Sequence, residues 1–244
     1  YIQWPESYPI DCEAFMKDNS GKYVKYLWDP NSYINIMVYN FTTEPNSNSV
    51  TLGISHIPFS TTGKHYLEGL GETDYSHLTL ANLQFPLSVS INSLYINEES
   101  TPTEYSTADI AVTLAHELGH YLGLHHVFAE TDNGTCEDTD YCKDTKSYNK
   151  QEYDSKCDYI YENEREKYTF KNLVKRTGCD GIEFISYNIM DYAISYSNQF
   201  TQNQRERIRH VLSYSPLIPG PKKGDIDTRA LNEGPLDLPI RTIK

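Results

Sequence analysis

Three histidines and one glutamate lie at fixed offsets within an eleven-residue stretch of the sequence. His116 and His120 are four residues apart, Glu117 follows the first of them, and His126 follows Gly123 by three residues. On a helix, a spacing of four places two side chains one turn apart on the same face. Their ring nitrogens can then converge on one cation, so this spacing predicts a metal site.

The residues after the first two histidines complete the predicted site. Gly123 favours the left-handed conformation that ends a helix, and the chain can then bring His126 to the same cation. Three histidines with an open fourth position are typical of catalytic zinc, where bound water has a pKa of roughly 7. Glu117 can reach such a water and is the predicted general base. His125 is the alternative third ligand, but the offset from Gly123 favours His126.

A helix must hold the first two histidines in place. Ser106 or Thr107 can cap it, and Asp109 lies in its first turn, where a carboxylate is favourable. Apolar residues form the stripe that such a helix needs on one side. They are Ile110, Leu114, Ala115, Leu118 and Leu122. We therefore expect a half-buried helix that ends at Gly123.

The residues before the motif predict a sheet. Residues 33–41, 50–58, 77–84 and 88–96 are enriched in β-branched, aromatic or alternating apolar residues. A short helix is expected around residues 13–17. His56, His65 and His77 also lie in this half, and no partner has metal-ligand spacing to them. We expect core or surface roles for these three histidines.

The residues after the motif are more polar. Residues 130–181 have too little apolar periodicity for a core of their own. Four of the five cysteines lie there, without a CxxC pair, which favours disulfides over a second metal site in an exported protein. They are Cys136, Cys142, Cys157 and Cys179, and Cys12 is left over. Thr201 and Gln204 predict a capping box that opens a helix over residues 200–214.

Length and charge narrow the class of protein. The 244 residues suit one compact domain that a cleft can divide into two lobes. A formal net charge of −13 argues against nucleic acid or an anionic membrane as a partner. No apolar run of about eighteen residues exists, so no segment is expected to span a membrane. We expect an exported monomer, secreted, periplasmic or lipid-anchored, whose signal segment is absent from this chain.

Several spaced segments together resemble the pappalysin and cytophagalysin family of the metzincin metallopeptidases. The segments are His116 to His126 continued by Val127 and Phe128, then Asp140, Asp144 and Thr145, then residues 188–192 (NIMDY), and then Asn198 to Arg207. They cover roughly residues 30–215. The ending over residues 214–221 is similar to that of predicted zinc metallopeptidase lipoproteins of Bacteroidetes.

This resemblance implies an α+β fold. The upper lobe, about residues 1–123, would hold a twisted mixed sheet and the active-site helix. The lower lobe, about residues 124–215, would be irregular, disulfide-stapled and closed by a helix. Residues 1–215 would form a single catalytic domain, and residues 216–244 a Pro/Gly-rich tail. The strand nearest the cleft would run antiparallel to bound peptide, and residues 93–97 are our candidate for it.

The resemblance also implies roles for single residues. Met190 would be the Met-turn methionine beneath the zinc, and Tyr192 would stabilise the oxyanion. The family's calcium-binding loop maps onto Asp140 and Thr145, with Glu130 as a third candidate; a solvated acidic loop is the alternative. In the family, Cys136 would pair with Cys179, which leaves Cys142 with Cys157.

Motif and resemblance together indicate a zinc-dependent endopeptidase that acts on proteins or peptides, with Zn²⁺ as cofactor and Ca²⁺ as a second candidate cation. Glu117 would deprotonate water and then protonate the leaving amine. Two alternatives remain open: a non-enzymatic zinc-containing binding or adhesin module, and a narrow amidase for cell-wall peptides. The five intact motif positions weigh against the first alternative.

Overall fold

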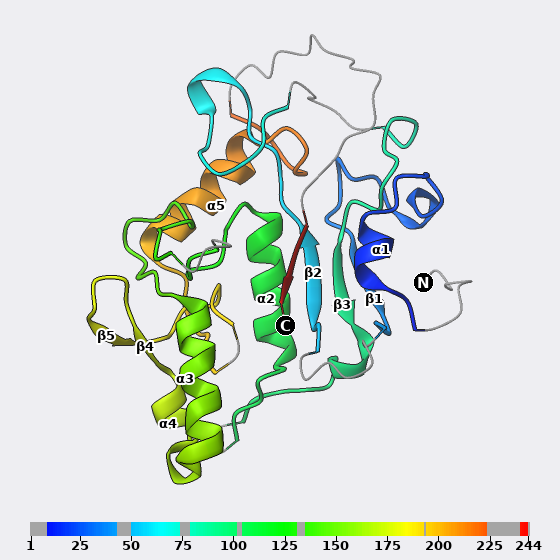
Figure 1. The fold of residues 1–244 in the computed structure, drawn as a ribbon. Helices are drawn as coiled ribbons and strands as arrows, with labels where there is room; N and C mark the ends of the chain where they lie inside the picture. Colours follow the sequence, from blue (N-terminus) through cyan, green and yellow to red (C-terminus); the bar gives the residue numbers. More distant parts are fainter. Residues whose placement is uncertain are drawn as a thin grey trace. The chain divides into compact units, whose positions relative to one another are not determined.

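The computed structural model describes residues 9–42, 50–73, 79–101, 104–130, 135–192, 194–223 and 240–243. It is an α+β protein with a mixed sheet, as predicted (Figure 1). The chain falls into two compact units. The first comprises residues 1–123 and 207–244, and the second comprises residues 124–206.

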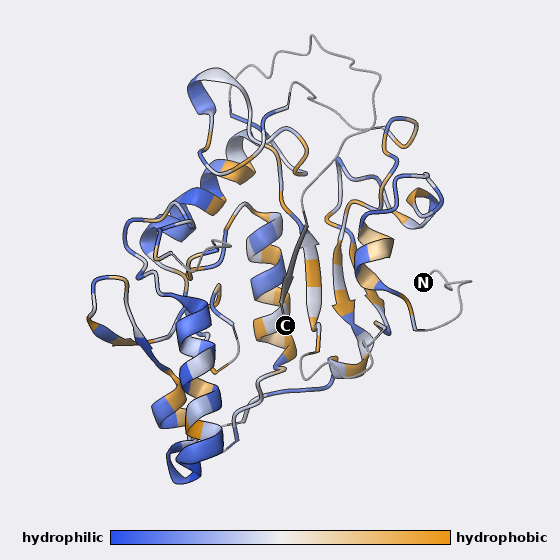
Figure 2. Ribbon diagram, in the orientation of Figure 1, coloured by the Kyte–Doolittle hydropathy of each residue, from blue (hydrophilic) through white to orange (hydrophobic). Residues whose placement is uncertain are grey.

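A four-stranded sheet forms the framework of the first unit. Its strands are β1 (Ile36–Tyr39), β2 (Gly53–His56), β3 (Val89–Asn92) and β6 (Ile240–Ile243), in the order β1-β3-β2-β6. β1 is parallel to β3, whereas β2 is antiparallel to both β3 and β6. Each of three predicted strand segments therefore contains a strand, although a shorter one. Figure 2 shows apolar residues along β2 and β3, where Ile54, Val89 and Ile91 are buried.

Two strand predictions are wrong. The described part of residues 77–84 forms a turn, because the Asn82 side chain accepts a hydrogen bond from the Thr79 N–H at 2.7 Å. Ser93–Tyr95, inside the expected edge strand, is a 3₁₀ helix (η3) whose N-cap, Asn92, accepts from Leu94 N at 3.2 Å. Such local side-chain bonds compete with strand pairing. The strand next to β3 on this side is β2, and β6 forms the edge of the sheet beyond it.

Helix α2 (Ile110–Tyr121) packs against β2 and β3 and carries the first two histidines. It ends where predicted, but Asp109 is its N-cap in place of Ser106 or Thr107. The Asp109 carboxylate accepts from Ala111 N at 2.9 Å and Val112 N at 3.2 Å, which satisfies two helix N–H groups. The short helix expected near residue 13 is present as α1 (Cys12–Met16). The first unit also contains η1 (Val24–Tyr26) and η2 (Gly63–His65).

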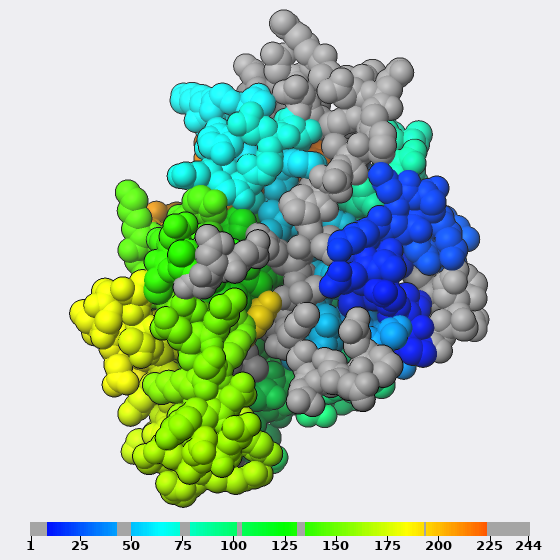
Figure 3. Space-filling view, in the orientation of Figure 1, coloured from blue at the N-terminus to red at the C-terminus, as the bar shows by residue number. Residues whose placement is uncertain are grey.

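The second unit has more regular structure than its sequence suggested. It contains α3 (Lys150–Asn163), η4 (Arg165–Lys167), α4 (Phe170–Leu173) and a hairpin of β4 (Lys175–Thr177) with β5 (Glu183–Ile185). Only Ile160 is buried among the α3 residues, so the helix lacks the apolar stripe that would have predicted it. Figure 3 shows α3 in yellow-green on the molecular surface. Asn149 caps α3 by accepting from Glu152 N.

Helix α5 (Gln202–Tyr214) begins with the predicted capping box. The Thr201 hydroxyl accepts from Gln204 N at 3.2 Å, and Gln204 Oε1 accepts from Thr201 N at 2.9 Å. Asp144 adds a third cap, because its carboxylate accepts from Asn203 N at 2.9 Å. Of the expected tail, residues 224–239 and 244 lie outside the described part of the chain. No helix in the described residues is long and apolar enough to cross a membrane.

One predicted disulfide is present, and the other is not. Cys136 and Cys179 are bonded, with Cα atoms 5.4 Å apart. Cys142 and Cys157 both remain thiols, so their expected pairing is wrong. Cys142 is buried in the loop that follows Asp140, whereas Cys157 lies on α3, where burial is the largest cause that raises its pKa. Cys12, the leftover cysteine, is a buried thiol.

Removing the Cys136–Cys179 bridge should destabilise the protein. The two cysteines are 43 residues apart, and a disulfide across a loop of that size is worth about 2–4 kcal/mol. We expect Cys136→Ser/Cys179→Ser to lower the free energy of unfolding by that amount in urea denaturation without reductant. Cys157→Ser is the matched control, and an equal loss in the control would contradict this expectation.

Candidate metal centre

His116 and His120 are fully buried on α2, and their Nε2 atoms are 3.1 Å apart. Four ligands at 2.0–2.1 Å around a tetrahedral zinc ion would place neighbouring nitrogens about 3.3 Å apart. The two rings are therefore already at the separation that one shared cation requires. The helical spacing of four residues produces this geometry without help from distant residues.

The turn at Gly123 directs the chain away from α2. Gly123 has φ +89°, in the left-handed region, and its N–H donates to the His120 carbonyl at 2.9 Å. A Cβ atom here would lie 2.8 Å from Val211 Cγ2, so space as well as backbone conformation favours glycine. The buried Arg207 donates from Nε to the Gly123 carbonyl at 2.6 Å. Arg207 therefore fixes the end of the histidine helix from α5.

Three residues after this turn, His126 completes the predicted set. His116, His120 and His126 each offer one ring nitrogen, and these atoms lie within 4.8 Å of one another. All three side chains are buried. The alternative ligand, His125, is also buried, but its ring packs against Tyr141 with centroids 5.3 Å apart. The donor set thus fits a metal ion at the predicted residues.

Glu130 contacts the third histidine. Its carboxylate oxygen lies at hydrogen-bond distance from His126 Nδ1, which leaves Nε2 of this ring for a cation. A carboxylate on the outer nitrogen of a metal-binding histidine fixes both ring orientation and tautomer. The structure thus places the Glu130 carboxylate at His126, and its expected role as a calcium ligand stays a prediction. The sequence carried no signal for this contact, because residues 126–130 are not helical and a spacing of four predicts contact only on a helix.

Tyr192 lies beside the same histidine. Its ring meets that of His126 edge-on, with centroids 4.6 Å apart. The Phe128 ring stacks on the His126 ring, with centroids 4.7 Å apart. Met190 is fully buried, and its carbonyl accepts from Val127 N at 3.2 Å. The segment of residues 188–192, the predicted Met-turn, thus holds the backbone directly after His126.

A buried ionic network fixes residues 188–192. Asp191 accepts hydrogen bonds from the Tyr148 hydroxyl at 2.5 Å and from Ser186, and it forms an ion pair with Arg176 at 3.3 Å. Arg176 also donates to the carbonyl of Ile194, whose φ of +66° is rare for a β-branched residue. Sequence reasoning missed Arg176, because a single arginine in a polar segment carries no local signal.

Gly53 on β2 makes room for the predicted general base. Glu117 is fully buried, and a Cβ atom at position 53 would lie 2.6 Å from Glu117 Cγ and 2.7 Å from Oε1. Glycine in a strand often marks such a close approach. This contact could not be predicted from the sequence, because the two residues are far apart along the chain.

The predicted calcium loop contains one unsatisfied oxygen. Asp140 is buried; its Oδ1 accepts from Cys142 N at 2.8 Å, whereas its Oδ2 is buried without a hydrogen-bond partner. Burial, with a smaller contribution from Asp138, raises the pKa of Asp140 to about 7. The Thr145 hydroxyl donates to the Cys142 carbonyl at 2.6 Å and retains acceptor capacity. This donor set fits a hard cation such as Ca²⁺.

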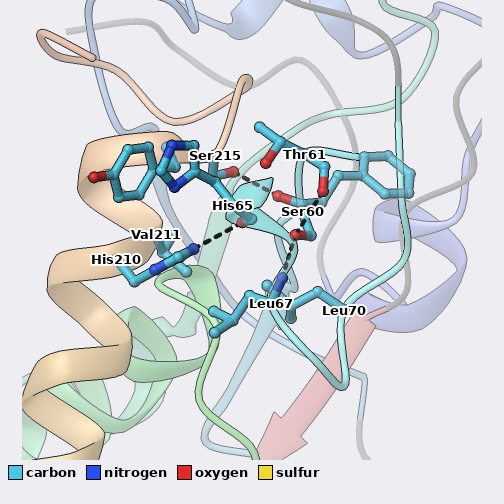
Figure 4. A pocket seen from close by; sticks show the side chains of 10 residues that line it. Ser60, Thr61, His65, Leu67, Leu70, His210, Val211 and Ser215 are labelled. Carbon is cyan, nitrogen blue, oxygen red and sulfur yellow. Dashed lines mark hydrogen bonds between the residues drawn. The ribbon is translucent and has the colours of Figure 1, made fainter. Parts of the chain in front are cut away.

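The other described histidines contact backbone carbonyls or aromatic rings and lie outside the predicted metal site. His56 contacts the carbonyls of Ser88 and Met16, and burial lowers its pKa to about 4. Figure 4 shows the hollow around His65, which stacks on Tyr214 with centroids 3.9 Å apart and accepts a hydrogen bond from His210 through its carbonyl. His77 lies outside the described residues.

A protein-family profile, curated proteins and solved structures all show similarity to this chain. The profile of the peptidase family described as pregnancy-associated plasma protein-A matches residues 18–213. Extracellular metalloproteases of Arthroderma benhamiae and Trichophyton verrucosum are each 37% identical over 97 residues, which is 39% of this chain and 29% of each relative. Mature mirolysin of Tannerella forsythia, in complex with a cleaved peptide, matches with a TM-score of 0.45 and 21% identity, over 80% of this chain and 58% of that chain.

Paired helical histidines, a glycine turn and a third histidine define the class of protein as a metallopeptidase of the HExxHxxGxxH type. The family profile matches most of the chain, and the chain therefore belongs to the pappalysin family of metallopeptidases. The predicted resemblance is confirmed. The chain spans less than a third of the length of the curated relatives that it matches.

Glu130→Gln should weaken metal binding. The amide keeps the size of the side chain but removes the negative charge at His126 Nδ1, and loss of such a partner lowers metal affinity roughly 10–100-fold. We expect this change in a zinc competition titration against a chromophoric chelator. Glu137→Gln, at an exposed position in the same unit, is the control. Equal zinc affinities of the two variants would show that the Glu130 contact does not tune the site.

Proposed function

We propose that this protein is a zinc-dependent endopeptidase that hydrolyses peptide bonds in proteins or peptides. The observation that supports this proposal best is the buried set of His116, His120 and His126, with ring nitrogens within 4.8 Å of one another. Membership in a metallopeptidase family makes zinc the expected ion. The extracellular relatives support export of the protein.

The residues around the site have complementary roles in this proposal. A bound zinc ion supplies Lewis-acid chemistry, lowering the pKa of water and polarising the scissile carbonyl. Glu117 takes a proton from the attacking water and later delivers it to the leaving amine. Tyr192 donates its hydroxyl hydrogen bond to the carbonyl oxygen as negative charge develops there. Glu130 keeps the imidazole of His126 in one orientation throughout.

Glu117→Gln should abolish most peptide hydrolysis without changing the fold. The amide occupies the same space against Gly53 but cannot accept the proton of water, and loss of a general base costs roughly 10²–10⁴-fold in rate. Cleavage of a casein-type substrate and of a fluorescent peptide library measures kcat, while zinc content and Tm report on the site and the fold. We expect both of these to stay unchanged.

Glu99→Gln, at an exposed position ahead of α2, is the control for this experiment and should keep full activity. Normal turnover by Glu117→Gln would refute the assigned role. Wild-type protein that cleaves neither substrate but releases amine from purified peptidoglycan would instead identify a cell-wall amidase. A lack of hydrolysis in all three assays would favour the non-enzymatic alternative.

We further propose that the loop around Asp140 binds Ca²⁺, with Asp140 and Thr145 among its ligands. The buried Oδ2 atom of Asp140 supports this proposal, since it has no hydrogen-bond partner in the structure. An ionised carboxylate in such a position is unfavourable until a cation binds. Asp144 instead caps α5, and the loop therefore connects a cation site to the start of that helix.

Adding Ca²⁺ to zinc-loaded, calcium-depleted protein should raise its Tm. At a calcium concentration of about 100 Kd the stabilisation is about 2.7 kcal/mol, which corresponds to roughly 5–10 °C for a domain of this size. Differential scanning calorimetry measures this shift. Asp140→Asn should lose the response, whereas Asp158→Asn, exposed on α3, should keep it. A shift that survives in Asp140→Asn would place the calcium elsewhere.

A further inference from the structure

The outer edge of β2 is covered by the last described residues of the chain. β6 pairs antiparallel with β2, placing Gly53 opposite Ile243, Ile54 opposite Thr242, Ser55 opposite Arg241 and His56 opposite Ile240. In Figure 1, β6 is the dark red arrow between β2 and α2. It is in contact with both of these elements. All three belong to the first unit.

This edge lies next to the proposed general base. Gly53 is the residue of β2 that leaves space for the Glu117 side chain, and Gly53 is also a residue that β6 pairs with. On its other side, β2 is already paired with β3. A peptide that adds to the sheet beside Glu117 must therefore take the position that β6 holds.

Backbone pairing at a sheet edge is largely independent of side-chain sequence. An exposed edge presents unpaired N–H and C=O groups and accepts any extended strand of suitable register. Residues 240–243 (IRTI) are rich in β-branched residues, which favour extended structure. They are joined to Lys223 by residues 224–239, and a tethered strand competes at an effective concentration on the order of millimolar.

We propose that the β2 edge is a peptide-binding surface and that residues 240–243 of the same chain occupy it as a displaceable internal ligand. This inference rests on the proposed function of the site. In the paired state β6 blocks an extended substrate from the edge beside Glu117. A substrate, or removal of β6, opens this edge, so residues 240–243 regulate access to the site.

Proline substitutions in β6 test the inference without touching the site residues. Arg241→Pro/Thr242→Pro removes two backbone N–H groups from β6 and is incompatible with a paired strand. Thr228→Pro/Arg229→Pro changes the same two residue types upstream of the strand and is the matched control. We expect the KM for a peptide substrate to fall roughly tenfold in the first variant, with kcat unchanged, and to stay unchanged in the second.

Two measurements do not depend on catalysis. Hydrogen exchange of residues 53–56, followed by mass spectrometry, should be roughly tenfold faster in Arg241→Pro/Thr242→Pro than in the wild type or the control. A fluorescein-labelled peptide with the sequence of residues 238–244 should bind this variant at least roughly tenfold more tightly than the wild type, by fluorescence anisotropy.

The outcomes separate this inference from the proposed function. Faster exchange and tighter peptide binding without hydrolysis by any variant would support the internal ligand and overturn the peptidase proposal. Equal exchange at residues 53–56 and equal peptide binding in all variants would overturn the internal ligand, whatever the activity. Protection that appears only at high protein concentration would also overturn it, because the strand would then come from a second copy.

Discussion

The convergence of three buried imidazoles depends on how the chain leaves helix α2. Two of the rings follow from helical spacing, which puts their Nε2 atoms 3.1 Å apart. The third requires a reversal directly after the helix, and Gly123 provides it with a positive φ and with no side chain to meet Val211. Arg207, on α5, donates a hydrogen bond to the Gly123 carbonyl. A side chain at position 123 would therefore disturb the backbone on which the donor set depends.

Two carboxylates fix one donor histidine and the segment that holds the backbone after it. Glu130 contacts the outer nitrogen of His126, and the buried Asp191 ties residues 188–192 to Arg176 and Tyr148. Burying an ion pair is costly unless further hydrogen bonds satisfy it, and here Asp191 has such bonds. The stiffness that results suits a site in which small displacements of a catalytic group reduce the rate.

Strand β2 both leaves space for the Glu117 side chain at Gly53 and pairs with a second extended segment at its outer edge. Glycine weakens a strand, since it has no side chain to pack, yet at position 53 it lets the backbone approach the Glu117 carboxylate. The same strand offers its outer edge to a second extended segment, which in this structure is β6. Proximity of Glu117 to this edge suits the proposed hydrolysis of extended peptides, and the pairing of β6 at the same edge underlies the proposed regulation of access to the site.

The sequence by itself determined the features set by covalent spacing: the paired histidines, the glycine turn and the Thr201–Gln204 capping box, because neighbours on a helix have fixed geometry. It did not predict α3, whose stability does not come from an apolar stripe of its own, or the 3₁₀ turn at Ser93–Tyr95. The approach of Gly53 to Glu117 and the pairing of β2 with β6 join residues far apart in the chain. Only the tertiary structure decided these contacts, because packing and backbone pairing between distant segments leave no periodic signal in the sequence.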